Sequence, residues 1–516
     1  MTEHDLRQMN DKYLLSLPHE KLTAVAINLL NDLKDARDRL NQNPHNSSRP
    51  PSSQEPWVKA KFAEESESSE EESSEPQDNF PDEPSEDNAA EREKNSVKNT
   101  KKKPKRKAGK QKGAKGFGRT QKLPITGENI HYAVVCAVCN SHLKEERFTA
   151  FTGHYVIDIK VGEQQKPGIQ LTNTKHIYGD TLCDCGHITR TQPYRCPDEK
   201  GWAVNMSEWH LVGPCLMSFI ICLAMRMRLS RPRIQELLKD WLKVHLSIGT
   251  INQCIHEGGR ASEPVEEQMI DETINSNLLH VDETSWKESG KPLWLWVFTT
   301  LTVSLYMIGY RTSTIIDDLL GNDFLGWMMS DGYRVYRKYK NRLRCLAHLR
   351  RKAQGLKESV NNEASAFGIK TLALLSTLMS AVYQARESPE IDLVKKYGDL
   401  LREFRGLCEQ HQNAAHDKTR ALAREFINDW EAIFRVLQYP YLPLTNNEAE
   451  QALRHWVIAR KLSHGTRTSQ GSRAFTLLAS VIETCRKRNV SPWDYLAEVI
   501  AARRSGGTVP PIPSVC

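Results

Sequence analysis

The stretch Leu278-Leu279-His280-Val281-Asp282 is a short apolar run that ends in a carboxylate. It predicts a buried strand. Residues 293–297 and 300–308 are rich in Trp, Val, Thr, Phe and Tyr, and predict two adjacent strands. Residues 326–330 lead into a second carboxylate, Asp331. These segments predict a mixed sheet in which Asp282 and Asp331 terminate adjacent strands.

Helical signals follow the predicted sheet. Glycine and proline are scarce between residues 339 and 438, which predicts a helical insertion over about 339–440. Residues 446–461 predict a further helix that carries Glu450, and residues 475–488 predict one more. The tail, residues 505–516, is rich in Gly and Pro and is expected to be loose.

Asp282, Asp331 and Glu450 together suit a site for two divalent metal ions. Magnesium takes hard oxygen ligands and keeps several waters. Two such ions about 4 Å apart activate an attacking hydroxyl and stabilise the leaving oxygen of a phosphoryl displacement. An aspartate at the end of a strand is most often a turn residue, so the ordered set of three carries the prediction.

Four ordered motifs resemble the signatures of the insertion-sequence-66 transposases, a bacterial family of the DDE type. They are VDET at 281–284, MSDGY at 329–333, CLAHLRR at 345–351 and NNEAEQALR at 446–454. Matched residue by residue, the catalytic carboxylates of the family fall on Asp282, Asp331 and Glu450. The resemblance implies that these three hold two Mg²⁺ or Mn²⁺ ions.

The resemblance extends from Cys136 to Val509 and implies a fold and an activity. The fold is a multidomain α/β protein with a ribonuclease-H-like catalytic core and a helical insertion. The activity is transposition: the protein binds double-stranded DNA at the ends of its element, cleaves at the 3′ ends and joins them to target DNA. A homo-oligomer on DNA and helper proteins of the same element are implied partners. The alternatives are an inactive regulator derived from a transposon, which the intact carboxylates argue against, and a nuclease without strand transfer.

Cysteine spacing predicts a zinc module over residues 124–205. Cys136 and Cys139 form a Cys-x-x-Cys half-site. Our first choice for the other two ligands is Cys183 and Cys185, and either His187 or Cys196 is an alternative to one of them. Four protein ligands leave no open coordination position, so this zinc would be structural.

Cys345 and His348 form a second pair at helical spacing. Zinc takes four ligands and only two are apparent, so we interpret this pair as packing at the root of the insertion. Arg350, Arg351 and Lys352 follow directly and are candidates to contact DNA phosphates.

Residues 1–45 predict a zipper-like helix. Apolar residues recur with alternating spacings of four and three, at Leu22, Ala26, Leu29, Leu33, Ala36 and Leu40. This a/d seam predicts pairing with another copy or with another helix of the chain. The alternative is an amphipathic helix packed on the body.

Residues 46–123 do not predict a folded domain, because an acidic block at 64–93 and a basic block at 98–122 bury too little apolar surface. The basic block should bind any DNA in a salt-sensitive way. Its candidate contacts are Lys101, Lys102, Lys103, Lys105, Arg106 and Lys107. A merely solvated linker is the alternative.

Residues 206–270 predict a helical region that resembles a helix-turn-helix, with a turn at 246–250 and a second short helix at 251–258. Any helical hairpin gives the same pattern. Further basic residues flank or follow Glu450 and suit a DNA track beside a metal site: Arg454, Arg460, Lys461, Arg467 and Arg473.

The chain has 516 residues, too many for one core. The remaining predicted units are the catalytic core at 271–475 and a C-terminal helix and tail at 476–516. The longest apolar run noted, about 211–225, is shorter than the ~18 residues of a membrane span and predicts a buried helix. The polar N-terminus lacks the apolar core of a signal peptide, and together these features predict a cytoplasmic protein that associates with the nucleoid.

Overall fold

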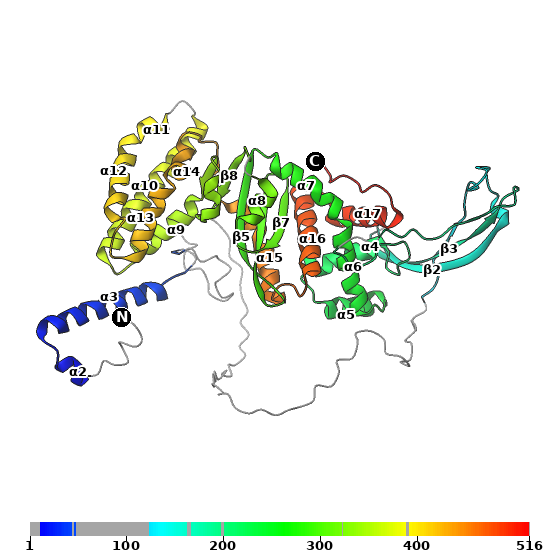
Figure 1. The fold of residues 1–516 in the computed structure, drawn as a ribbon, viewed down its shortest axis with the longest axis horizontal. Coiled ribbons are helices and arrows are strands. Elements are labelled where there is room, and N and C mark those ends of the chain that lie inside the picture. Colours follow the sequence, from blue (N-terminus) through cyan, green and yellow to red (C-terminus); the bar gives the residue numbers. More distant parts are fainter. Residues whose placement is uncertain are drawn as a thin grey trace. The chain divides into compact units, whose positions relative to one another are not determined.

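A computed structural model describes residues 11–43, 46–47, 123–162, 167–197, 201–321, 324–388 and 392–514. The acidic and basic blocks, with the six candidate DNA contacts between Lys101 and Lys107, lie outside these residues. The described residues form a mixed α/β fold (Figure 1).

The larger sheet has five strands in the order β7-β6-β5-β8-β9. Their bounds are β5 Leu278–Glu288, β6 Lys291–Thr299, β7 Ser304–Gly309, β8 Trp327–Ser330 and β9 Arg342–Arg344. The first three strands form an antiparallel meander, and β8 and β9 run parallel to β5. The sheet is therefore mixed, as the sequence predicts, with β5 at its centre.

Two details of the sheet differ from the prediction. Residues 300–303 form a turn, closed by a hydrogen bond from Thr300 N to Val303 O of 2.9 Å, so that β7 starts later than expected. β9 is a short strand inside the segment that was predicted to be entirely helical. Its two arginines give no local strand signal, and only pairing with β8 makes it a strand.

The helices that pack most closely against the sheet include α15 (Asn447–Ser463), which follows the insertion, and α16 (Ser469–Lys487). α16 lies along the edge strand β7, where Ser480 Oγ accepts from Tyr306 N at 2.9 Å and Thr484 Oγ1 accepts from Ser304 N at 3.1 Å. These bonds satisfy backbone donors that an open edge would leave unpaired. Trp296, Tyr306 and Trp456 fill the core beneath.

The segment after β9 forms a set of helices with its own apolar core. These helices are α9 Leu346–Lys357, α10 Asn362–Glu387, α11 Leu393–Lys396, α12 Gly398–His411, α13 Asp417–Asn428, α14 Trp430–Phe434 and the 3₁₀ helix η4 Arg435–Leu437. By length and composition α10 alone, among the described helices, could cross a membrane. It buries Phe367, Leu375 and Val382 in the insertion core, which is the behaviour of a core helix.

A helical region precedes the sheet: α4 Pro214–Met225, α5 Arg231–Leu242, α6 Ile248–Ala261 and α7 Glu263–Ile274. α4 is largely buried, as predicted for the apolar run. α6 begins within the predicted turn because Ser247 caps it, accepting from Thr250 N at 3.0 Å. The second half of α6 is buried. In its first half, Asn252 and Gln253 are among the exposed residues.

The structure also contains helices and strands that the sequence analysis does not predict. α17 (Pro492–Ser505) packs on α4 and α6, and α8 (Thr314–Leu320) and the 3₁₀ helix η3 (Arg334–Lys338) follow β7 and β8. Residues 124–190 form a second sheet, with β1 Gly127–His131, the 3₁₀ helix η2 Glu145–Arg147, β2 Phe148–Val161, β3 Ile169–Leu182 and β4 Ile188–Arg190. The antiparallel pair β2–β3 forms a long arm (Figure 1).

The predicted N-terminal helix is α3 (His19–Leu40), preceded by the short α2 (Asp11–Leu15). The seam residues of α3 are mostly exposed, and Leu33 is 67% exposed. Asp38 is buried where α3 ends, and it accepts a hydrogen bond from the Ser359 hydroxyl. Asn46, at the start of the expected linker, is also buried, and its Nδ2 donates to Glu358 Oε2 at 2.6 Å.

Candidate active site and metal centre

The carboxyl ends of three parallel strands meet at one edge of the larger sheet. His280 of β5 pairs with Met329 of β8, and Ser330 of β8 pairs with Arg344 of β9. If the pairing of β5 with β8 continues for two more residues, Asp282 lies level with Asp331. If the pairing of β8 with β9 continues for one more residue, Asp331 lies level with Cys345, whose N–H donates to Ser330 O at 3.0 Å. The sheet thus brings the two predicted aspartates together, with a thiol beside them.

Asn446 ties the helix that carries Glu450 to this edge. Its Nδ2 donates to Val281 O at 2.9 Å, and its Oδ1 lies 3.1 Å from His280 Nδ1. Its backbone N–H donates to Cys345 Sγ at 3.2 Å. Glu450 follows one helical turn later, with its N–H bonded to Asn446 O at 3.1 Å. The sequence reasoning did not single out Asn446, although it is the first residue of the fourth motif.

Negative charge accumulates around Asp282. Burial raises the pKa of Asp282 well above its usual range, and the charges of Glu283, Asp331 and Glu450 raise it further. The Asp282 carboxylate accepts from Glu283 N at 2.9 Å, and Asp331 Oδ1 accepts from Tyr333 N at 2.8 Å. These bonds leave most of the carboxylate lone pairs for another ligand, and clustered carboxylates of this kind favour a bound cation.

Glu450 contacts the helix α9 rather than solvent alone. Its Oε1 lies 3.1 Å from Arg351 Nη2 and 3.7 Å from His348 Nδ1. Burial, with the charges of Arg351, Lys352 and Arg344, lowers the pKa of His348 to about 3, so this imidazole is neutral. Ligand atoms of Cys345, His348 and Glu450 all lie within 4.8 Å of one another. The pair that we interpreted as packing therefore has a third donor, contributed by a distant helix.

Two glutamates close in sequence to the predicted metal ligands bond to other residues. Glu283, next to Asp282 in β5, is buried; it accepts from Tyr336 Oη at 2.6 Å and from Arg311 Nη2 at 2.7 Å. Glu448 is exposed and lies 3.3 Å from Lys487 Nζ of α16. Neither shares the partners of Glu450.

Some of the basic residues expected to contact DNA are engaged within the protein. Lys352 pairs with Glu425 at 2.6 Å, and Arg473 pairs with Glu266 at 2.6 Å. Arg460 donates to Thr284 Oγ1 and Ser285 Oγ, both at 2.9 Å. The sequence predicts that these three side chains contact DNA, whereas in the structure they bond to other residues of the protein. Four others are exposed: Arg350, Arg454, Lys461 and Arg467.

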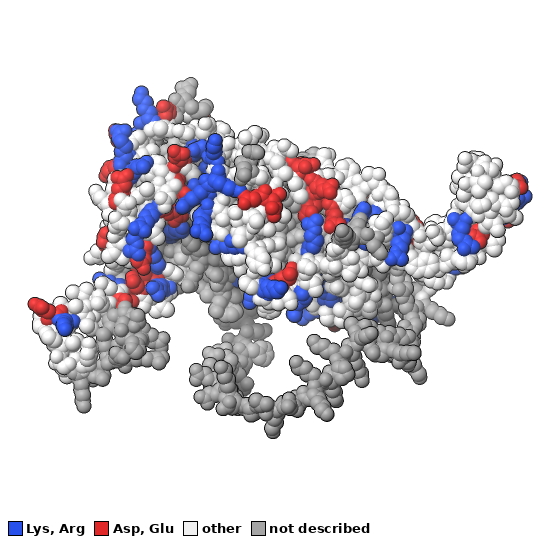
Figure 2. All heavy atoms as spheres, in the orientation of Figure 1, with Lys and Arg blue, Asp and Glu red and all other residues white. Residues whose placement is uncertain are grey.

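A basic hollow lies where the insertion meets the sheet. Figure 2 shows Lys and Arg gathered over this part of the molecule. A cavity of about 460 Å³ there is lined by Arg337, Lys340, Arg342, Arg405 and Arg435 around Trp430 and Asp429. The sequence reasoning missed this set, because its members come from segments about 100 residues apart.

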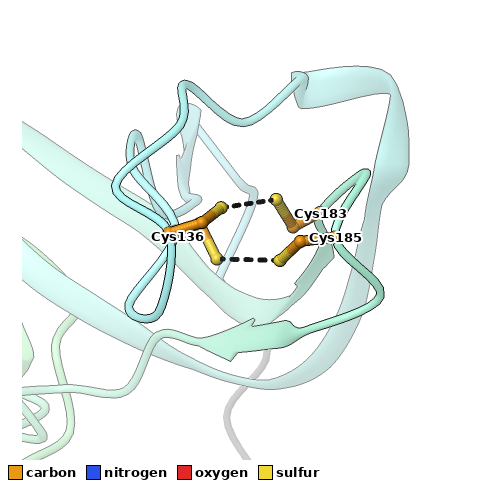
Figure 3. A group of neighbouring side chains, drawn as sticks. Cys136, Cys183 and Cys185 are labelled. Carbon is orange, nitrogen blue, oxygen red and sulfur yellow. Dashed lines mark hydrogen bonds between the residues drawn. The ribbon is translucent and has the colours of Figure 1, made fainter.

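The four cysteines chosen first from the sequence form one cluster at the end of the β2–β3 arm (Figure 3). The sulfurs of Cys136 and Cys185 are 3.7 Å apart, and those of Cys139 and Cys183 are 3.5 Å apart. Four tetrahedral thiolates about 2.3 Å from a zinc ion would be separated by roughly 3.8 Å, so the donor set fits zinc.

Local backbone geometry builds this cluster. Cys136 and Cys139 lie in the loop after β1, and Asn140 closes it with a φ of 56°. Cys183 and Cys185 lie in the turn between β3 and β4, where Gly186 has a φ of 84° that favours glycine. Hydrogen bonding with the Ser141 side chain and backbone lowers the pKa of the Cys139 thiol to about 6, which favours the thiolate that binds metal.

The alternative ligands lie outside the cluster. Cys196 is buried in the main core, 4.0 Å from Arg260 Nη2, and is therefore not available to the metal site. His187 is likewise absent from the described group of ligand atoms; its backbone carbonyl accepts from Cys183 N at 2.9 Å.

A family model described as "Transposase IS66 family" matches residues 210–474, about half of the chain. The match includes Asp282, Asp331 and Glu450, and it begins after the four cysteines.

Two curated proteins of Sinorhizobium fredii are similar to parts of the chain. "Uncharacterized protein y4qI" is 24% identical over 303 residues, which cover 52% of this chain and 55% of that protein. "Uncharacterized protein y4jO" is 35% identical over 68 residues, 13% of this chain and 21% of that protein. The chain thus spans about half the length of the first relative and about a fifth of the second.

Proposed function

Because this chain belongs to the IS66 transposase family, we propose that it is a DDE transposase whose metal-binding carboxylates are Asp282, Asp331 and Glu450. Family membership implies DNA as a substrate and divalent metals as cofactors. The observation that carries the residue assignment is the strand register, which sets Asp282 and Asp331 level at one sheet edge. Asn446 joins that edge to the helix of Glu450.

The donor set fits magnesium or manganese. The three side chains offer only hard oxygen atoms, and the charges of Asp331 and Glu450 act on the partly buried Asp282. When bound, two such ions would lower the pKa of an attacking hydroxyl and stabilise the leaving oxygen of the displacement. The strand order β7-β6-β5-β8-β9, with its parallel and antiparallel parts, is compatible with a ribonuclease-H-like core interrupted by the insertion.

The residues of the chain position this reaction. Asp282 lies in β5 and Asp331 directly follows β8, so the pairing of these two strands sets the spacing of their carboxylates. Arg351 lies 3.1 Å from Glu450 and would help to orient this carboxylate. In the first step, water attacks the phosphorus at the end of the element and the bond to the 3′ oxygen breaks. In the second step, the freed 3′ hydroxyl attacks a target phosphodiester, and the target strand's own 3′ oxygen leaves.

The four-cysteine cluster supports a structural zinc ion in the module that includes the arm. Cys136, Cys139, Cys183 and Cys185 would hold it and so join the loop after β1 to the turn after β3. The module would contribute to holding the DNA ends of the element.

The test is a cleavage and joining assay with the purified full chain, Mg²⁺ and DNA that carries the sequences flanking its coding region. We expect nicks that leave 3′ hydroxyls at the element ends, followed by products joined to a target plasmid. Cleavage without joined products would identify a nuclease. Binding to the ends without either product would identify a regulator and would overturn the proposal.

A further inference from the structure

The base of the arm carries an aromatic stack made of His131, His154, His176, Tyr178 and Trp209. Ring centroids are 4.3 Å apart for Tyr178 and His131, 5.1 Å for His131 and His176, and 5.2 Å for His176 and His154. The last member, Trp209, lies 4.9 Å from His154 with an interplanar angle of 29°. Neighbouring strands place these rings on one face of the sheet, because His131 pairs with Tyr178 and His154 pairs with His176.

The stack behaves as an apolar surface. Both ring nitrogens of His154 are buried and have no hydrogen-bond partner among the described residues. Burial, followed by the charge of a neighbouring histidine, lowers the pKa of both His154 and His176, so that both rings are neutral near pH 7. A neutral stack can be extended by one more flat ring without burying a charge.

The exposed end of the stack opens onto a cavity of about 510 Å³. Trp209 is 47% exposed there, and Phe151, from β2, is 63% exposed in the same cavity. The guanidinium of Arg190 lies 4.2 Å from the centroid of the Phe151 ring. The cavity is also lined by two exposed amide side chains, Gln192 and Asn205.

This combination matches the chemistry of a nucleobase. Exposed aromatic rings and a planar guanidinium offer surfaces for stacking, and each amide offers both a donor and an acceptor to the edge of a base. The charge of Arg190 is balanced by Asp180, with bonds of 2.7 and 2.8 Å. Arg195, which also lines the cavity, adds a second guanidinium, so stacking and hydrogen bonding would act there together with its charge.

We propose that this cavity binds an unpaired nucleotide of a DNA strand, with its base stacked on Trp209 and its edge toward Gln192 and Asn205. Bases within a duplex have both faces covered by their neighbours, so only an unpaired base can occupy a pocket of this kind. The inference rests on the proposed function, since it assigns the arm a role at DNA ends. It adds a site for single-stranded DNA that is separate from the carboxylates.

The test compares two DNAs with the same duplex sequence, one blunt and one with a three-nucleotide unpaired tail, by fluorescence anisotropy with the full chain. The wild-type protein should bind the tailed DNA more tightly. Trp209→Ala should reduce that preference about fivefold or more, which is the range for loss of one stacked base, and should leave blunt binding unchanged. Trp209→Phe should retain most of the preference.

Two further variants serve as a second test of the cavity and as a control. Phe151→Ala removes an exposed ring and should also weaken tail binding, even if Trp209→Ala does not fold. Tyr383→Ala removes a half-exposed ring of α10, far along the chain from the arm, and should change neither affinity. The salt dependence of binding should be the same for Trp209→Ala and wild type, because no charge is removed.

The proposal is overturned if the wild type shows no tail preference, or if Trp209→Ala and Phe151→Ala both leave that preference intact. This outcome is separable from failure of the proposed function. A chain that cleaves and joins DNA but has no tail preference has a transposase site without the pocket. A chain that prefers tailed DNA through Trp209 but never cleaves has the pocket without the enzyme.

Discussion

Asp282, Asp331 and Glu450 can each be made neutral with little change of shape. We expect Asp282→Asn, Asp331→Asn and Glu450→Gln each to lower cleavage by several orders of magnitude, because each removes a charge that the metal ions require. DNA binding should survive, since phosphate contacts come mainly from basic residues. Gel assays of cleavage, with anisotropy for binding, measure the two effects separately.

Glu448→Gln is the matched control for these variants. Glu448 is exposed and pairs with Lys487, so most of the activity should remain. If Glu448→Gln abolished cleavage and Glu450→Gln did not, the third carboxylate would be misassigned. Glu283, the carboxylate next to Asp282, is unsuitable as a second control because it is buried against Tyr336 and Arg311.

The raised pKa of Asp282 predicts a link between metal binding and pH. Burial and three neighbouring negative charges favour its protonated form, so a metal ion must displace a proton. Below the raised pKa, Mg²⁺ affinity should therefore increase with pH by up to about tenfold per unit, and it should level off above it. Thermal shift titrations with Mg²⁺ at several pH values measure this slope, and a slope of zero over the whole range would contradict the shift.

At the scale of elements, a buried ion cluster joins the insertion to the sheet. Asp429 accepts from Arg342 Nη2 at 2.8 Å and lies 3.2 Å from Arg344 Nε and 3.1 Å from Arg337 Nε. A Cβ added to Gly332, directly after Asp331, would lie 2.7 Å from the Arg344 guanidinium. The cluster therefore also packs against the loop that carries a catalytic candidate.

Removing Asp429 should destabilise the protein strongly. Asp429→Ala leaves Arg342 buried without its partner and leaves Arg344 with Glu425 alone, and we expect a loss of about 3–5 kcal/mol in the free energy of unfolding. Denaturant unfolding followed by circular dichroism measures it. Glu431→Ala, on the same helical segment but largely exposed, is the control and should change stability little.

The same cluster predicts a pH dependence of stability. Burial alone would raise the pKa of Asp429, but the hydrogen bond from Arg342 and the charges of Arg342, Arg344 and Arg337 lower it. A carboxyl with a lowered pKa stabilises the fold fully above its unfolded value, and this contribution is lost as the pH falls through the folded value. The Asp429→Ala penalty should therefore shrink in strongly acidic buffer.

The cysteine cluster predicts a bound zinc ion, and this can be tested directly. Freshly purified protein should contain about one zinc ion per chain, and Cys136→Ser should lose it while the larger sheet stays folded, because that sheet has a separate core. Metal analysis by mass spectrometry measures the zinc content. Cys196→Ser should keep the zinc, since Cys196 lies in the main core; loss of zinc in that variant instead would mean that the ligand set is different.

At the scale of the whole molecule, the exposed seam of α3 predicts self-association. Leu22 and Leu33 are exposed, and within the described part of the chain no helix covers this seam. The double variant Leu29→Glu and Leu33→Glu should lower the mass measured by light scattering, because the charges repel across a paired seam. Substitution of Lys34, which is not a seam residue, by Glu should leave the mass unchanged. An equal mass for the seam variant and wild type would favour an unpaired amphipathic helix.

Short-range features of the sequence determined much of this protein. The apolar run at 278–281 and the run that ends at Asp331 are long enough to define their strands, and helical spacing defined α3, α5, α15 and α16. The resemblance of the four motifs to those of a known family indicated which three carboxylates to expect at the site. The Cys136 and Cys139 half-site was equally local, because both thiols lie in one loop.

Only the tertiary structure decided which distant residues meet. Nothing local makes residues 342–344 a strand, yet pairing with β8 does, and it sets Cys345 beside Asp331. Packing of Cys196 into the main core left Cys183 and Cys185 as the partners of the first half-site. Arg351 and Arg473 were expected to face DNA but pair with Glu450 and Glu266. The physical reason is the same in each case: periodicity reflects neighbours within a turn or two, whereas sheet register and buried ion pairs depend on residues far apart in the chain.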